Sequence, residues 1–454
     1  MADQSAVPPS ARELPTAPGH WLLGHAREMA ASPHLLVARL AAAHDGAARF
    51  RLLHRRFVAV ADPSLARQLL INHPELFPRS FHYGNTALVT GPGMLATDGP
   101  LWQERRRMAQ PAFKSPMLAT AVAATATAVA ARLPGWSAAA RSGTPHPLHD
   151  DCQHLALSVI GHALLSEEVA AADAGRFVAA LRAALWHIRR RNTSVFPLPT
   201  WLPTPAHRAL HATRADLDAF VAPRIAARLA GERRSDILQT LVDARIGEAT
   251  GPAPESTLRD ETKTLFAAGF ETTAAALTWA LYRLADDQAA QQRVADEVAT
   301  VLGDRQPTAA DLDRLTWTEA VVDEVLRLHP PVYNMARAAQ ADAVVDGRQF
   351  RRGDIVMISV YGLHRHPIWG ADAERFNPER FLTGGAPRQA YLPFGLGRHT
   401  CIGNTFALAE LTIAVALICR SFCLSPVVGQ GIPAARAQIT LAPASDVPLI
   451  FTPR

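Results

Sequence analysis

The sequence is poor in cysteine, in aromatic side chains and in charge of one dominant sign, and each shortage excludes a class of protein. Its 454 residues include four cysteines, Cys152, Cys401, Cys419 and Cys423, without CxxC or zinc-ligand spacing. So few cysteines exclude a disulfide scaffold, and the expected compartment is a reducing cytoplasm. The net charge is +5, the arginines are scattered and aromatic residues are 7%. This excludes a clustered nucleic-acid surface and indicates a basic face for an acidic protein partner.

Long apolar runs and targeting segments are also missing. Residues 1–18 are polar and proline-rich, without the charged and then apolar pattern of a signal peptide. No run of 18 or more strongly apolar residues is found, and the stretch 117–131, mostly Ala and Thr, is typical of an ordinary soluble helix. We therefore expect a soluble, cytoplasmic protein without a transmembrane anchor.

What the sequence does contain is a large apolar fraction, 48%, and no internal repeat. The hydrophobic patterning predicts helices over 35–43, most of 64–328 and 402–419, and strands over 50–53, 57–60, 344–345 and 355–360, the last two as a hairpin. The proline-rich stretch 196–205 interrupts the helices, and 366–400 is irregular, which in a compact domain usually indicates function. The predicted fold class is mainly α, one large helical domain over 1–454 with small β-sheet regions.

The irregular stretch ends in Phe394-Gly-Leu-Gly-Arg-His-Thr-Cys401-Ile-Gly403. Two glycines before the cysteine permit a tight turn, and Gly403 permits a flat group to approach the backbone. The predicted helix that follows presents its first amides and positive dipole end to the sulfur, which favours a thiolate. A lone cysteine is more often a small buried hydrophobe, and that alternative applies to Cys419 and Cys423.

This stretch resembles the haem-binding signature of the cytochrome P450 family, Phe-x-x-Gly-x-basic-x-Cys-x-Gly. The resemblance implies haem b, iron protoporphyrin IX, with Cys401 as axial ligand in a meander and cysteine loop over 366–403. A thiolate donates electron density that favours O–O cleavage. The family most often has Arg at the basic position, where this chain has His399 after Arg398. His399 would bond a haem propionate in a pH-dependent way.

A second motif is Glu324-Val-Leu-Arg327, whose ends share a helix face. Such a pair is usually a solvated surface contact, but its flanks here are apolar, so we expect it to be buried. The resemblance adds a third member, Arg380 of Phe376-Asn-Pro-Glu-Arg380-Phe. The family's triad of this kind fixes the meander around the cysteine loop and is structural.

A third motif, Ala267-Ala-Gly-Phe-Glu271-Thr272-Thr273, lies in a predicted helix over 257–285. Gly and paired Thr are poor helix formers, and a close helix crossing at Gly269 would explain the glycine. By resemblance this is the oxygen-binding segment of the family's central helix. Ala268 and Gly269 would then leave room for O2, Thr272 would position it, and Glu271 would supply protons.

A fourth motif, Trp102-Gln-Glu-Arg-Arg106, places Trp102 and Arg106 one helical turn apart. By resemblance both reach one haem propionate, and Arg337 reaches the propionates from a second position. Phe394, Gly395 and Gly403 complete the expected haem-binding set. The expected substrate pocket is walled by the loop 79–97 and by 179–201, together with these side chains: Phe270, Thr273, Val332, Tyr333, Asn334 and Met335.

The resemblance implies a monooxygenase that inserts one oxygen atom of O2 into an apolar molecule such as a terpene, fatty acid or steroid, by hydroxylation or epoxidation in secondary metabolism. A peroxide-driven peroxygenase or an isomerase on the same scaffold is an alternative that the Glu271–Thr272 pair disfavours. A non-catalytic haem-binding sensor is a remote alternative.

We expect a monomer that takes electrons from a ferredoxin or flavodoxin fed by an NAD(P)H reductase. Its expected docking face is Arg105, Arg107, Arg351, Arg352 and Arg398.

Overall fold

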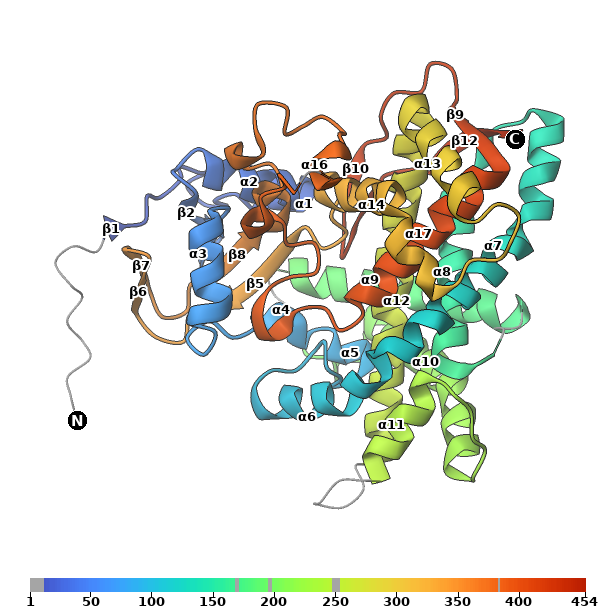
Figure 1. Ribbon diagram of the computed structural model, residues 1–454. Helices are drawn as coiled ribbons and strands as arrows, with labels where there is room; N and C mark the ends of the chain where they lie inside the picture. The colour runs from blue at the N-terminus through green and yellow to red at the C-terminus, as the bar shows by residue number, and fades with distance from the viewer. Residues whose placement is uncertain (1–11, 168–170, 195–197, 247–253, 383) are drawn as a thin grey trace. The chain divides into compact units, whose positions relative to one another are not determined.

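The protein is seen in a computed structural model that describes residues 12–167, 171–194, 198–246, 254–382 and 384–454 (Figure 1). The chain divides into two compact units that alternate along the sequence. We call Met1–Tyr83, Val332–Arg375 and Ala386–Cys401 the sheet unit, and Gly84–Pro331, Phe376–Gly385 and Ile402–Arg454 the helical unit. Neither unit is a continuous segment, and the single domain expected over 1–454 stays a prediction.

The sheet unit is built on a four-stranded sheet of order β2-β3-β8-β5. Its strands are β2 (Ala47–Leu52), β3 (Arg55–Val60), β8 (Ile355–Ser359) and β5 (Asn334–Ala338). The pairings β2–β3 and β8–β5 are antiparallel, and β3–β8 is parallel. The last four residues of β3, Phe57 to Val60, are all buried, as expected of a central strand covered on both faces.

The hairpin predicted between 344–345 and 355–360 is wrong in its second strand. The strand β6 (Ala343–Val345) pairs with β7 (Arg348–Phe350) across Asp346-Gly347, and β7 also pairs with β1 (Arg12–Glu13). The strand β8 instead joins β3 and β5 in the larger sheet. The turn residues were placed correctly, but both runs are apolar, and only pairing partners distant in sequence distinguish the two sheets.

Short helices and turns complete the sheet unit. They are α1 (Ala26–Ala31), α2 (Pro33–Ala42), α3 (Pro63–Arg67), α4 (Phe81–Gly84), which ends one residue into the helical unit, α15 (Val360–Leu363), the π-helix η1 (Gln68–Asn72), and the 3-10 turns η4 (Pro367–Trp369), η5 (Arg388–Ala390) and η6 (Gly397–His399). The predicted helix at 35–43 is confirmed as α2. Between His366 and Thr400 the described chain, which omits residue 383, has only brief turns and one four-residue helix at Glu379–Leu382, which confirms the predicted irregular stretch.

The helical unit is arranged around α12 (Glu255–Asp286), a 32-residue helix that confirms the prediction over 257–285. The other helices are α5 (Ala87–Thr90), α6 (Gly99–Ala109), α7 (Ser115–Ser142), α8 (His149–Leu165), α9 (Ala171–Thr193), α10 (Pro205–Leu229), α11 (Ile237–Ile246), α13 (Gln288–Val301), α14 (Thr316–Leu328), α16 (Glu379–Leu382) and α17 (Asn404–Ser421), with 3-10 turns η2 (Gln110–Phe113) and η3 (Ala309–Arg314). The helices α8, α10, α14 and α17 all pack on α12 (Figure 1). Two small sheets, β4 (His146–Pro147)–β12 (Pro448–Pro453)–β9 (Phe422–Pro426) and β10 (Ala435–Ala437)–β11 (Leu441–Pro443), complete the unit.

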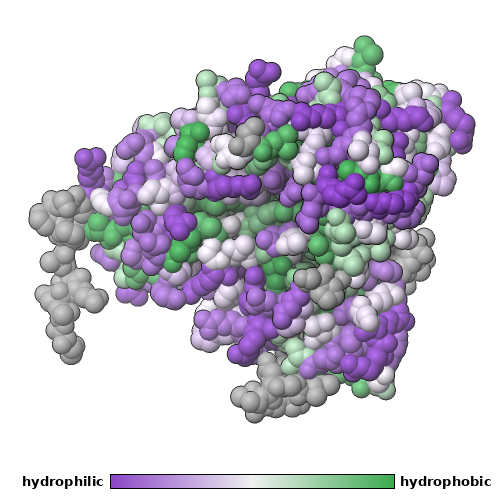
Figure 2. All heavy atoms as spheres, in the orientation of Figure 1, coloured by the Kyte–Doolittle hydropathy of each residue, from purple (hydrophilic) through white to green (hydrophobic). Residues whose placement is uncertain are grey.

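Two described helices, at Met117–Ser142 and Asn404–Ser421, are long and apolar enough to cross a membrane by length and composition, which is weak evidence. The absence of a transmembrane anchor therefore stays a prediction. Most of α17 is buried within the helical unit, as in the core helix of a globular protein. On the face shown in Figure 2, hydrophilic side chains cover much of the surface and apolar ones form small patches among them.

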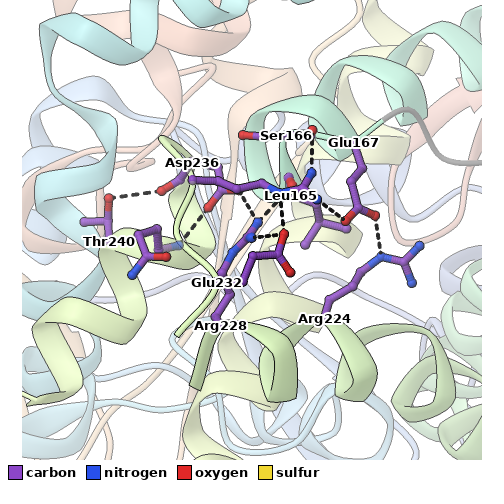
Figure 3. A network of polar contacts seen from close by, with 10 residues as sticks. Leu165, Ser166, Glu167, Arg224, Arg228, Glu232, Asp236 and Thr240 are labelled. Atoms are coloured by element: carbon purple, nitrogen blue, oxygen red, sulfur yellow. Dashed lines mark hydrogen bonds and ion pairs between the residues drawn. The ribbon is translucent and has the colours of Figure 1, made fainter. Parts of the chain in front are cut away.

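An ion-pair network fastens the ends of α8 and α10 to the start of α11 (Figure 3). Arg228 bonds Asp236 at 2.6 Å, the Leu165 carbonyl at 3.1 Å and Glu232 at 3.0 Å. Asp236 also accepts the backbone N–H of Gln239 at 2.8 Å, which caps α11. The side chains of Arg228 and Asp236 are 3% and 0% exposed, and both make several hydrogen bonds, although Nε of Arg228 is buried without a partner among the described residues.

Candidate active site

Cys401 lies at the end of a tight turn and is an exposed residue. The Cys401 N–H donates to the Phe394 carbonyl at 2.9 Å, and the Thr400 hydroxyl donates to the Gly397 carbonyl at 2.7 Å. Gly395 and Gly397 have φ of 76° and 75°, the left-handed conformation that the two predicted glycines permit. Of the four cysteines, Cys401 alone is exposed.

Contacts within the sheet unit hold this turn rigid. A Cβ on Gly397 would lie 2.3 Å from the Leu70 carbonyl oxygen, so only glycine fits there against η1. Arg398 donates to Glu75 at 2.8 Å and to the Pro74 carbonyl at 3.1 Å. The turn is therefore docked on the segment that follows α3.

A histidine that the sequence analysis missed supports the chain just before the turn. The backbone N–H of Leu392 donates to Nε2 of His364 at 2.8 Å, and His364 is fully buried. This contact makes His364 a positioning residue for the cysteine loop. No local signal reveals it, because a single histidine in a sequence without its partner is indistinguishable from a core residue.

The other cysteines lie in unsuitable surroundings. Burial raises the pKa of the Cys152 and Cys419 thiols to about 12, which keeps both protonated. Cys423, which was expected in the core, is half-buried on β9, where its thiol donates to Gln288 at 3.3 Å. Cys423 does not follow a glycine turn and is less exposed than Cys401, so Cys401 remains the candidate ligand.

The middle of α12 is exposed, although most of the helix on either side is buried. Ala268 is exposed and Gly269 and Thr272 are half-buried, whereas Phe266 and Phe270 are fully buried. The Thr272 hydroxyl donates to the Ala268 carbonyl at 2.6 Å, a bond that turns the hydroxyl back on its own helix. This short exposed patch carries the predicted oxygen-binding motif.

Glu271 lies beside that patch with a desolvated carboxyl group. Its Oε2 atom is buried without a hydrogen-bond partner among the described residues. Burial raises the pKa of Glu271, and the nearby Thr440 hydroxyl and Arg182 guanidinium offset this only in part. A carboxyl with a raised pKa can hold a proton closer to neutral pH than an exposed glutamate, as proton transfer requires.

Gly269 has a packing reason in this structure. A Cβ at this position would lie 2.9 Å from Cδ1 of Ile160 on α8, closer than real side chains approach. The close helix crossing weighed from the sequence is therefore present. A role of Ala268 and Gly269 in leaving room for O2 stays a prediction.

The predicted triad is brought together inside the helical unit. Arg327 donates to both carboxylate oxygens of Glu324, at 2.6 and 2.7 Å, and both side chains are fully buried. Arg380 forms an ion pair with Glu324 at 3.6 Å, and the backbone N–H of Asn377 donates to Glu324 at 2.8 Å. Glu324 thus ties α14 to Asn377 and Arg380 in the meander.

The residues expected at the propionates come from separate elements. On α6, Trp102 is buried and Arg106 half-buried, one turn apart on one helix face. On β5, Arg337 is 3% exposed and donates to the Ala336 carbonyl at 3.1 Å. His399 lies half-buried in the cysteine turn. Their binding of a haem carboxylate stays a prediction.

The strand β5 carries two of the six expected pocket residues, Asn334 and Met335, and Val332 and Tyr333 come just before it. A Cβ on Gly395 would lie 3.5 Å from the sulfur of Met335, so β5 contacts the cysteine turn. Both amide atoms of Asn334 are buried without a hydrogen-bond partner in the described structure. Val332 is 41% exposed and Tyr333 half-buried. In the helical unit, Phe270 and Thr273 are buried, as core residues are.

The expected docking face is wrong at Arg105. Its side chain is buried on α6 and forms an ion pair with Glu261 of α12 at 3.8 Å, so it cannot meet a partner protein. Arg107 and Arg352 are exposed, Arg351 pairs with Glu13 at 2.6 Å, and Arg398 pairs with Glu75. A run of three arginines on a helix cannot all face solvent, because successive residues point 100° apart.

The metal-binding side chains of the described residues fit a haem iron better than a metal ion held by protein side chains alone. Among the described residues no three His, Cys, Asp or Glu side chains form a cluster that could hold a metal ion. Haem iron needs one protein ligand on its axial side, since the porphyrin supplies the other four. An exposed thiol in a rigid turn, with half-buried Phe394 and Leu396 beside it, meets that need.

Comparison with known proteins gives a consistent result. The family model described as cytochrome P450 matches residues 14–446. Two relatives from Streptomyces melanosporofaciens are cyclooctat-9-en-7-ol 5-monooxygenase, 32% identical, and cyclooctatin synthase, 31% identical. Each alignment covers 94% of this chain and 93% of the relative. The crystal structure of the cytochrome P450DA heme domain has a TM-score of 0.88 at 27% identity, over 98% of both chains.

Proposed function

Because this chain belongs to the cytochrome P450 family and is a haem-thiolate monooxygenase, we propose that Cys401 is the haem ligand and that the substrate is a largely hydrocarbon molecule with one polar group. The observation that carries the assignment of Cys401 is its position as an exposed residue at the end of a turn held by Phe394, Gly397 and Arg398. The other three cysteines are buried or lie on a strand.

Thiolate-bound haem b supplies the activation of O2. The chain's own residues bind and orient it. Trp102 and Arg106 on α6, Arg337 on β5 and His399 would hold its two carboxylates, since Arg forms paired hydrogen bonds with a planar carboxylate. Glu324 and Arg327, bonded at 2.6 and 2.7 Å, would fix the meander that precedes the cysteine turn.

Glu271 and Thr272 form the proposed proton path on α12. The buried carboxyl of Glu271 holds a proton at higher pH than an exposed acid does, because burial raises its pKa. The Thr272 hydroxyl now donates to the Ala268 carbonyl, and rotation about χ1 would free it to donate to a ligand on the exposed side. This pair is a reason to prefer an O2-dependent enzyme over a peroxide-driven one.

The proposed substrate is a terpene, fatty acid or steroid-like compound, which would be hydroxylated or epoxidised in secondary metabolism. One relative is named for cyclooctat-9-en-7-ol, an alcohol, and this supports a substrate with a single hydroxyl group. The unpartnered amide of Asn334 can donate to and accept from such a group, while Met335 is apolar.

Electrons would come from separate proteins, a ferredoxin or flavodoxin served by an NAD(P)H reductase. The exposed Arg107, Arg351 and Arg352 and the half-buried Arg398 are the remaining candidates for a basic docking face. We further propose that the enzyme acts as a monomer in the cytoplasm. Charge reversal at Arg107 or Arg352 should slow electron transfer at low salt, and an unchanged rate would remove that residue from the face.

The deciding experiment is an absorption titration of the purified ferric protein with terpenes, fatty acids, steroids and aromatic polyketides. A saturable spectral shift with one class identifies the substrate class. Cys401→Ser should abolish the thiolate spectrum, whereas the matched control Cys423→Ser should leave it unchanged. A thiolate spectrum that survives Cys401→Ser and disappears with Cys423→Ser would overturn the ligand assignment.

A further inference from the structure

A short loop of the sheet unit, His20 to Gly24, presents two large apolar side chains to solvent. Trp21 is 80% exposed, and its neighbour Leu22 is 54% exposed. Single exposed apolar residues are ordinary, but tryptophan is highly buried on average, because its ring buries a large area. Two adjacent apolar side chains left in water at one turn indicate a surface that meets an apolar partner.

Hydrogen bonds close this loop at both of its ends. The His20 N–H donates to the Gly24 carbonyl at 3.2 Å, and the Gly24 N–H donates to the His20 carbonyl at 2.8 Å. The Nδ1 atom of His20 accepts the N–H groups of Leu22 and Leu23, each at 3.2 Å. Gly24 has φ of 59°, and a Cβ there would lie 2.1 Å from the Arg51 carbonyl oxygen, so only glycine fits. The loop is therefore a fixed turn.

Arg51 of β2 attaches the turn to the sheet. Its guanidinium donates to the carbonyls of His20 at 2.8 Å, Leu22 at 3.1 Å and Trp21. A further bond goes to the Leu53 carbonyl at 3.0 Å, at the turn between β2 and β3. One guanidinium thus makes four bonds that orient a loop whose most exposed side chains are apolar. A loop that is already ordered loses little conformational entropy when a partner covers it, so this turn is preorganised for binding.

Positive charge predominates in the segments around the turn. Residues 14–61 contain six arginines and two acids, an excess of four positive charges in a chain whose net charge is +5. Three of these arginines form ion pairs: Arg39, Arg49 and Arg56. The other three are not paired with a carboxylate of any described residue: Arg27, Arg51 and Arg55. The surroundings of the apolar pair are therefore basic and complement an anionic partner.

Two of these arginines lie close to the turn in the chain or in the sheet. Arg27 of α1 is exposed and follows Gly24 by three residues. Arg55 begins β3, directly after the β2–β3 turn, and its guanidinium lies 4.7 Å from the ring centre of the exposed Phe81. A tryptophan with arginines beside it suits the surface of an anionic bilayer. The amphipathic indole is stable at the level of the lipid headgroups, and arginine is attracted to anionic lipids.

We propose that the turn His20 to Gly24 is a peripheral contact with an anionic lipid bilayer. Trp21 and Leu22 enter the headgroup region, and Arg27 and Arg55 interact with the lipid phosphates. The protein lies on the bilayer at this turn, and the contact requires no membrane-spanning helix. It is built entirely from residues of the sheet unit and does not rest on the proposed function. Anionic lipids are present on the cytoplasmic leaflet, so the contact is compatible with a cytoplasmic enzyme.

Co-sedimentation of the haem-loaded full chain with lipid vesicles tests this contact. The chain should bind vesicles that mix phosphatidylcholine with phosphatidylglycerol, less tightly at high salt, and should bind phosphatidylcholine alone far more weakly. Trp21→Ala and Leu22→Ser should each lower the affinity for the anionic vesicles by about tenfold, since each removes apolar area that the bilayer covers. Wild type that does not bind anionic vesicles, or binding that neither variant weakens, would overturn the proposal.

Val428→Ser is the matched control for Leu22→Ser. Val428 is fully exposed as well, but the stretch 425–435 around it carries no charge. This variant should bind anionic vesicles as tightly as wild type, and an equal loss would show general adhesion of apolar surface in place of a specific contact. Arg27→Glu leaves the apolar pair intact and should weaken binding by about tenfold, because it reverses a charge at the bilayer surface. Unchanged affinity in Arg27→Glu would contradict the basic part of the contact.

Sedimentation equilibrium without vesicles examines the other apolar partner that the turn could have, a second copy of this chain. A dimer that Trp21→Ala dissociates would overturn the membrane contact in favour of a self-interface. Because Trp21 and Leu22 are exposed, both variants should unfold at the same urea concentration as wild type, which separates lost binding from lost folding. These measurements do not depend on turnover or on the haem ligand, so the membrane contact and the proposed function fail separately.

Discussion

The helical unit buries charged groups in two contrasting ways. Where α8, α10 and α11 meet, Arg228 and Asp236 bond each other at 2.6 Å and further partners surround them (Figure 3). Along α12 and α17, in contrast, Glu261, Glu271 and Glu410 each have at least one buried oxygen without a partner. One set is nearly satisfied by hydrogen bonds and the other is not.

The difference distinguishes structural charges from candidates for function. A buried polar atom without a partner costs about 1–3 kcal/mol, so a protein evolving for stability alone would remove it. The unsatisfied carboxyls on α12, which also carries the exposed Ala268, are therefore candidates for function, because a ligand, a water molecule or a transferred proton could complete their hydrogen bonds. The satisfied pair lies at a junction of helix ends and defines their geometry.

The largest effect is expected from Asp236→Asn. It leaves the guanidinium of Arg228, 3% exposed, without its anion, and should lower the free energy of unfolding by about 3–5 kcal/mol. Urea unfolding followed by circular dichroism measures this. Glu232→Gln, whose side chain is 41% exposed, is the control and should have a much smaller effect. A loss below about 1 kcal/mol for Asp236→Asn would show that the network is not structural.

Glu410→Gln should act in the opposite direction. Glu410 is fully desolvated on α17, and burial raises its pKa well above 4.5. A carboxyl with a raised folded pKa contributes most below pH 4.5 and loses its contribution as the pH rises through the folded pKa. The variant should therefore be more stable than wild type at pH 8, by about 1–3 kcal/mol, with little difference at pH 4. Equal stability curves from pH 4 to pH 8 would contradict the assignment.

Glu271→Gln should separate stability from chemistry. Because the acid is already unsatisfied, the free energy of unfolding should change by less than about 1 kcal/mol. Product formed per electron should fall by about tenfold or more, since a positioned acid contributes this much or more to proton transfer. In wild type this yield should decline as the pH rises through the raised pKa of Glu271, and the variant should lose that decline. Full coupling in the variant would exclude Glu271 from the proton path.

The smallest effect is expected from Arg233→Ala. Its ion pair with Asp243 at 3.0 Å joins side chains that are 68% and 46% exposed. An exposed pair contributes about 0.5 kcal/mol or less, and salt screens it. Thermal unfolding at low and high salt should barely distinguish the variant from wild type. A loss as large as that of Asp236→Asn would remove the contrast between buried and exposed members of the network.

Much of the site could be predicted because its signals are local. The turn before Cys401 requires two residues in the left-handed backbone conformation, which its glycines permit. Glu324 and Arg327 share a helix face because they are three residues apart. The helix α12 followed from periodicity within one stretch. The partner of His364, Leu392, and the partner strand of β8, β3, could not be predicted in this way. Each partner lies far away in sequence, so the residues next to His364 or β8 give no signal of it.

Arg105 and Arg107 differ in burial, and the sequence by itself did not predict this difference. Composition and motifs determined the family resemblance, the helical fold and the candidate ligand, because turn chemistry and helical spacing act between near neighbours. The three arginines from 105 to 107 looked alike in sequence, and one docking face was assigned to the outer two. Only the tertiary structure turned Arg105 inward to Glu261 and left Arg107 in solvent, because burial depends on which helix packs against which face.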